Sequence, residues 1–160
     1  MSAGSWQAFA DVLSEENRCL GELGAAALGM TRILVLGTAA DIEAAVCNVE
    51  AKLALHAQAS LRRTTMMKSG FGELSLGQVC SYAPGALRRS VFLSLRDLRV
   101  RGIGLRITVA NNKALSTAGL KRIASTIAVM QRNAGESDGT YRRRGVPAPA
   151  NGSLIVSRKA

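Results

Sequence analysis

Residues 91–130 of the chain, VFLSLRDLRVRGIGLRITVANNKALSTAGLKRIASTIAVM, decide its fold. Large apolar residues recur there at intervals of three, four or sums of these, which is the spacing of one stripe along an α-helix. The stripe consists of Val91, Leu95, Leu98, Leu105, Val109, Leu120, Ile123, Ile127 and Met130. Small or polar residues interrupt it at Gly102, Asn112 and Ser116. This heptad-like seam predicts a long helix over residues 85–133 that packs in coiled-coil fashion.

Residues 103–109 also alternate apolar and polar side chains, which is the pattern of a half-buried β-strand. No neighbouring segment offers a partner strand, and an isolated strand leaves its backbone groups unpaired. Helix is therefore the preferred interpretation of this segment.

Two further long helices and one short helix are predicted upstream. The first is capped at Ser5 and continues through residues 33–36, with an apolar stripe formed by Trp6, Phe9, Val12, Leu13, Leu20 and Leu23. Its opposite face carries Glu15, Glu16, Asn17 and Arg18. A capping box at residues 38–41 opens the second helix, residues 39–68, with a stripe of Ile42, Val46, Val49, Leu53, His56 and Ser60. A second capping box at residues 75–78 starts a short helix that ends before Pro84.

The fold class predicted from these segments is all-α. We expect an antiparallel coiled-coil-like bundle of three long helices plus one short helix, formed by residues 1–134. The remaining residues, 135–160, combine Gly, Pro, Ser and charged residues in a composition that cannot bury a core. They are predicted to form a flexible basic tail.

Charge is unevenly distributed along the chain. Residues 1–60 contain three basic and seven acidic residues, a net charge of −4, whereas residues 61–160 contain 18 basic and four acidic residues, a net charge of +14. Such a basic half attracts anions of any kind, including nucleic acid, lipid head groups and acidic protein faces. A solvated helix surface that keeps the chain soluble explains the same charge equally well.

The sequence predicts a cytoplasmic protein that does not insert into a membrane. Cys19, Cys47 and Cys80 are far apart and form no CxxC pair, so reduced thiols are expected. No signal peptide is recognisable at the N-terminus. The most apolar run, residues 30–36, is far shorter than the roughly 20 residues of a membrane-spanning helix.

No pattern of catalytic or metal-binding residues emerges. His56, the sole histidine, lies in the middle of a predicted helix, where a structural role is favoured over general-base work. No HExxH, DxD, GxSxG or GKS/T motif occurs, and no acidic residue combines with His56 at metal-ligand spacing. We therefore predict a binding protein and not an enzyme, with no cofactor and no metal.

Tyr141 is the one large side chain in its part of the predicted tail. An aromatic residue in a flexible segment is the usual form of a short docking motif, although it is more often neutral. The neighbouring residues 142–144, three arginines, could steer it toward an acidic site.

The order of these features resembles the FlgN family of flagellar type III export chaperones, over residues 9–145. The matching positions are Leu13, Glu15, Leu20 and Leu23; residues 37–42 and Lys52; residues 72–76 and 82–84; Asn112 and Leu115; and Gly139-Thr140-Tyr141 with Gly145. The last of these, similar to a Thr-Tyr-x-x-x-Gly tail, is the most specific.

The resemblance implies a chaperone that holds hook–filament junction proteins in the cytosol and delivers them to the flagellar export gate. On this resemblance, the client's C-terminal helical region would contact Asn112, Leu115, Leu120, Ile123, Ile127 and Met130, and Tyr141 would engage the gate protein. The apolar seam could self-associate when no client is bound, and no nucleic acid is expected as a partner. The alternative is a basic helical module that binds nucleic acid or an anionic membrane surface.

Overall fold

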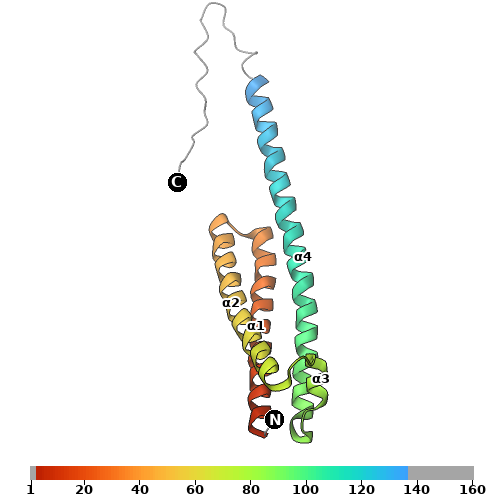
Figure 1. The fold of residues 1–160 in the computed structure, drawn as a ribbon. Coiled ribbons are helices and arrows are strands. Elements are labelled where there is room, and N and C mark those ends of the chain that lie inside the picture. Colours follow the sequence, from red (N-terminus) through yellow and green to blue (C-terminus); the bar gives the residue numbers. More distant parts are fainter. Residues whose placement is uncertain (1–2, 137–160) are drawn as a thin grey trace, which may run out of the picture. The chain divides into compact units, whose positions relative to one another are not determined.

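The computed structural model describes residues 3–136, and each of its four elements is an α-helix (Figure 1). The helices are α1 (Ala3–Leu36), α2 (Ala39–Phe71), α3 (Leu76–Ser81) and α4 (Gly85–Glu136). The predicted all-α class, with three long helices and one short helix, is therefore confirmed. Residues 103–109 lie within α4, so helix is the correct interpretation there. Residues 137–160, most of the predicted tail, lie outside the described residues.

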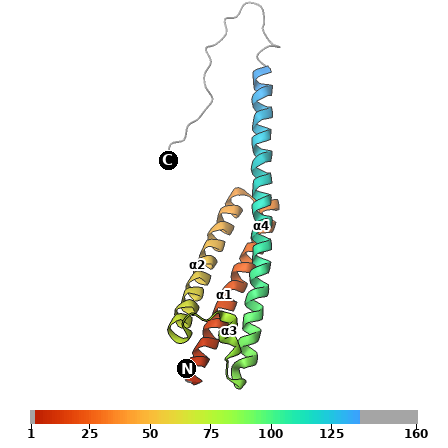
Figure 2. The same ribbon diagram turned by 45° about the vertical axis from the view of Figure 1, so that its right-hand side comes forward.

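The chain divides into two units, Met1–Gly119 and Leu120–Ala160. In the first unit α2 runs antiparallel to α1, because Glu16 pairs with Arg63 whereas Glu22, further along α1, pairs with the earlier residue Lys52. The part of α4 in this unit runs parallel to α1 and antiparallel to α2 (Figures 1 and 2). A turn can join antiparallel neighbours directly, but the parallel pair needs an intervening segment, and α2 with α3 supplies it.

The core of the first unit joins all four helices at the end where α2 leads into α3. Its fully buried side chains are Phe9, Leu13, Val79 and Val91. Around them pack Trp6, Met67, Cys80, Ala83 and Leu95. Trp6, Phe9 and Phe71 form an aromatic cluster with ring centroids 5.0–6.0 Å apart. The short helix α3 therefore contributes to stability, since its Val79 is among the most deeply buried residues.

Side-chain caps define the starts of α2 and α3 as the sequence predicts. Thr38 and Asp41 form a complete capping box, and so do Ser75 and Gln78. In each box the side-chain oxygen accepts a backbone N–H that has no partner within the helix. The cap predicted at Ser5 is wrong, because α1 already begins at Ala3. The second helix also continues three residues past its predicted end at position 68, to Phe71.

Glu16 and Asn17 were expected on the solvent face of the first helix, and the structure places them inside. Only 3% of Glu16 is exposed, and its carboxylate accepts a hydrogen bond of 2.5 Å from Arg63 of α2. The Asn17 side chain is half-buried and donates to the backbone oxygen of Ser94 on α4. The reason for the error is that α1 packs against α2 and α4 at once, so more than one face is covered. A single-stripe interpretation of a helix assumes one neighbour.

Two glycines inside α4 allow a test of helix stability. At Gly102 and Gly104 of α4 an added Cβ meets no atom within 4 Å, and neither has a positive φ. Replacing both with Ala removes the backbone entropy cost of a helical glycine, about 1 kcal/mol each. We expect Gly102→Ala/Gly104→Ala to raise the free energy of unfolding by about 2 kcal/mol, measured by urea denaturation followed by circular dichroism.

The control substitutions lie in the connections. A Cβ on Gly37 would lie 2.6 Å from the backbone oxygen of Ile33, and Gly72 has a φ of 64°. We expect Gly37→Ala and Gly72→Ala to destabilise the protein. A stabilising effect at either position would mean that the connections differ from those described.

Candidate protein-binding surface

The second unit presents a stripe of exposed apolar side chains on α4. Leu120, Ile123, Ile127 and Met130 are 69%, 59%, 48% and 65% exposed. Their intervals of three, four and three residues place them on one face of the helix. Isolated exposed apolar residues are ordinary, but four large ones aligned along a helix form the surface that an amphipathic partner helix covers. We call residues 120, 123, 127 and 130 the apolar stripe.

Two of the six predicted client-contacting residues, Asn112 and Leu115, lie in the first unit. Asn112 is 8% exposed, and its side-chain nitrogen donates to the backbone oxygen of Ala27 at 2.8 Å. Its side-chain oxygen accepts from the Thr31 hydroxyl at 2.7 Å. Leu115 is partly buried. Asn112 thus fixes the register between α1 and α4, and a client role for these two residues stays a prediction.

The surface of α4 within the first unit carries a second set of apolar side chains that the sequence analysis missed. Val100, Ile103 and Ile107 are each about 60% exposed and also follow a spacing of three and four. They are offset from Val91 and Leu95, which pack into the core. The helical spacing of these three residues is itself a sequence signal, but the stripe through Val91 already predicted the helix and gave no information about its other face.

Basic residues border the apolar surfaces of α4. From residue 98 to residue 135 the sequence contains seven basic residues and no acidic residue. Lys121, Arg122 and Arg132 accompany the apolar stripe, and all three are exposed. A negatively charged ligand is therefore attracted to this helix more strongly than a neutral one.

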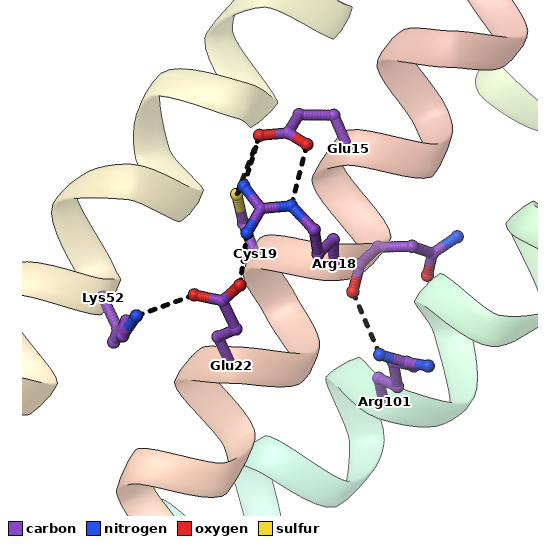
Figure 3. Close-up of polar contacts among 7 residues, drawn as sticks. Glu15, Arg18, Cys19, Glu22, Lys52 and Arg101 are labelled. Carbon is purple, nitrogen blue, oxygen red and sulfur yellow. Dashed lines mark hydrogen bonds and ion pairs between the residues drawn. The ribbon is translucent and has the colours of Figure 1, made fainter.

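Figure 3 shows a group of ion pairs on α1, one of which joins α1 to α2. Arg18 bonds both Glu15 and Glu22, and Lys52 of α2 donates to Glu22 at 2.7 Å. On the α4 side, Arg101 donates to the backbone oxygen of Asn17 at 3.1 Å. Burial raises the pKa of the neighbouring Cys19 thiol, so this cysteine stays protonated. These contacts position the helices.

The Glu22–Lys52 pair gives stability a pH dependence. Hydrogen bonding to Lys52 holds the pKa of Glu22 below its ordinary value of 4.5. The stabilisation of the folded state by this pair is therefore fully present above about pH 4.5. It is lost as the pH falls through the pKa that Glu22 has in the folded state, which is lower. We expect Lys52→Met to destabilise the protein at about pH 7 and to have a much smaller effect at about pH 3.

The control for this pH dependence is Lys113→Met, which removes an exposed lysine that pairs with no acidic residue among those described. Urea denaturation at the two pH values measures both variants. If the effect of Lys52→Met does not change with pH, the Glu22–Lys52 ion pair does not contribute to stability.

The part of the chain that the structure describes contains no group of three or more His, Cys, Asp or Glu side chains able to hold a metal ion. His56 is half-buried on α2 and lines an open cleft of ≈ 650 Å³ with Glu16 and Arg63. No hydrogen bond to His56 occurs among the described contacts. The expectation that the chain is not an enzyme stays a prediction.

One helix has the length and composition of a membrane span. Within α1, the segment Gly4–Leu36 is long and apolar enough to cross a membrane, and 22% of its most apolar 18 residues are buried. A signal sequence and the core helix of a soluble protein have the same length and composition, and α1 contributes Phe9 and Leu13 to the core. The prediction that the chain does not insert into a membrane rested on residues 30–36 and did not take this longer apolar segment into account.

Tyr141, predicted to dock on the export gate, lies outside the described residues, as do residues 142–144. Comparisons of the chain with protein-family models, with curated proteins and with solved structures find no match. The flagellar expectation therefore rests on the resemblance of sequence features alone.

Proposed function

We propose that the chain is a carrier that binds an amphipathic helix of another protein along the apolar stripe of α4. The observation that supports this is the exposure of Leu120, Ile123, Ile127 and Met130 at helical spacing. A partner helix that covers this stripe completes a coiled-coil pair and removes its own apolar face from water. The function is reversible protein binding and requires no cofactor.

The charge of α4 specifies the partner further. Because residues 98–135 are basic and contain no acid, the partner helix carries acidic residues beside its apolar face. Such flanking charge contributes mainly to the association rate and to partner choice, whereas the apolar contacts contribute most of the affinity. The complex accordingly keeps most of its affinity at high salt.

The specific form of the proposal is a flagellar export chaperone. Its clients are the C-terminal helical regions of hook–filament junction proteins, held in the cytoplasm before delivery to the export gate. What supports this form is the resemblance over residues 9–145, above all the Thr140-Tyr141 tail with Gly145. Aggregation-prone client helices that must be kept apart before assembly need an apolar surface of this kind.

The deciding experiment measures binding of the C-terminal helical segments of hook–filament junction proteins from the source cell to the full chain by isothermal titration calorimetry. A variant lacking residues 118–134 should lose all detectable binding and keep the far-UV helicity of the first unit. Binding that survives the deletion would refute the assigned surface. Binding to generic DNA or acidic vesicles that falls steeply with salt, with no client bound, would favour the basic-module alternative.

The role proposed for Tyr141 requires a separate measurement. We expect Tyr141→Ala to weaken docking on the purified export gate protein at least about tenfold, because an aromatic anchor supplies most of the energy of a short docking motif. Client affinity should be unchanged, and this provides the internal control. Equal gate affinity for the variant and the wild type would exclude the tyrosine from docking.

A further inference from the structure

A cleft of ≈ 730 Å³ lies between α3 and the first turns of α4, within the first unit. Its floor is apolar and well packed, formed by Cys80 and Leu95, which are 4% and 7% exposed. Phe92 forms part of its wall and is 61% exposed. This volume falls within the range of roughly 300–1,000 Å³ that is typical of small-molecule sites.

Three arginines line the same cleft. Arg88 is held at the α3–α4 turn, where its Nε donates to the backbone oxygen of Ala83 at 3.3 Å. Arg99 reaches across to α3, with Nη2 only 3.4 Å from the position of a Cβ on Gly77. Arg89 completes the set, one residue after Arg88.

The positive charge of the cleft has no counterpart within the bundle. No acidic residue lines the cleft, and none of the three arginines forms an ion pair among the described contacts. Burial raises the pKa of Cys80 and the charge of Arg99 lowers it, so the guanidinium acts on the floor of the cleft. All three arginines are exposed and line one cleft without a carboxylate, so their guanidinium groups are available to donate hydrogen bonds to a bound anion.

We propose that this cleft binds a soluble anionic small molecule, a carboxylate or phosphate attached to an aromatic or aliphatic body. Guanidinium groups bond carboxylate and phosphate oxygens in pairs, which positions the charged end. The apolar floor and the ring of Phe92 receive the body of the ligand. This site is separate from the apolar stripe, and the inference does not depend on the proposed function.

The experiment compares three probes by isothermal titration calorimetry on the full chain. They are inorganic phosphate, which has the charge without the body, 1-naphthol, which has the body without the charge, and 1-naphthyl phosphate, which has both. We expect 1-naphthyl phosphate to bind at least about tenfold more tightly than either of the others. Equal affinity for 1-naphthyl phosphate and inorganic phosphate would overturn the proposal, since surface charge alone explains that result.

Substitutions locate the probe. Arg89→Gln and Arg99→Gln should each weaken 1-naphthyl phosphate binding about tenfold, because each removes a charged hydrogen-bond donor. Phe92→Ala should weaken it similarly and leave inorganic phosphate unaffected. Arg32→Gln, at an exposed arginine of α1 away from the cleft, should change nothing.

Circular dichroism and the thermal midpoint establish that each variant is folded, so a loss of binding can be assigned to the site. An equal loss in Arg32→Gln and in Arg99→Gln would contradict the assigned location. Displacement of the probe by phosphatidylglycerol vesicles, but not by phosphatidylcholine vesicles, would overturn the assignment to a soluble ligand.

Discussion

Ile123→Asp/Ile127→Asp weakens binding of the partner helix at least about 100-fold, while the first unit keeps its stability. The two side chains are 59% and 48% exposed, so little packing within the protein is lost when they are replaced. In the complex, each isoleucine contributes roughly 1.5–3 kcal/mol by burial, and each new carboxylate is buried against apolar surface. A loss of about 2.7 kcal/mol already corresponds to 100-fold. Calorimetric titration of the client segment measures the effect.

The matched control is Ser125→Asp/Val129→Asp. This variant introduces the same two charges, also four residues apart, on the same helix. Each substituted residue lies two positions after the corresponding isoleucine, and therefore on a different face of α4. This variant should retain the affinity of the wild type to within a few-fold. Equal losses in both variants would show that acidic charge on α4, and not the face it occupies, governs binding.

The second large effect concerns the ion pair between the buried Glu16 and the partly buried Arg63. Arg63 is held by three contacts, through Nε to Glu16 at 2.5 Å, through Nη2 to Ser60 at 3.3 Å and through Nη1 to Met67 at 3.6 Å. Arg63→Met leaves the Glu16 carboxylate buried without its partner. We expect a loss of about 3 kcal/mol in the free energy of unfolding at neutral pH, measured by urea denaturation.

A double substitution separates the burial of charge from the loss of packing. Glu16→Leu/Arg63→Met replaces both charged side chains with apolar ones, and its stability should lie within about 1 kcal/mol of the wild type. Together with the two single variants it forms a double-mutant cycle. If Arg63→Met and the double variant are equally unstable, the stabilisation comes from packing of the arginine stem and the ion-pair explanation is wrong.

Local rules were sufficient to predict most of the fold. The capping boxes at Thr38 and Ser75 and the glycine that follows the first helix mark element boundaries by short-range chemistry, which a sequence contains in full. The glycine signal at residue 70 was wrong, because α2 continues through it to Phe71. The long helix α4 followed from its apolar period alone, even through Gly102 and Gly104.

Polar side chains with distant partners could not be placed in this way. Glu16 was wrongly expected on a solvated face, whereas Asn112 was predicted only as a client contact, a role that stays a prediction. The structure buries them because each meets a partner 47 or more residues away in the sequence. Their partners are Arg63 and the backbone oxygen of Ala27, and no periodicity identifies such pairs. The apolar stripe, in contrast, could be predicted as a face, although its exposure could not.

The parallel arrangement of α1 and α4 has a consequence for the order in which the chain folds. The ion pairs between α1 and α2 span 30 and 47 residues, whereas the hydrogen bonds from α1 to α4 span 77–85 residues. During synthesis at about 5–20 residues per second, the hairpin of α1 and α2 therefore precedes its contacts with α4 by several seconds. Over that interval the nascent chain presents Phe9 and Leu13 to water, and this is the stage at which it is most prone to aggregate.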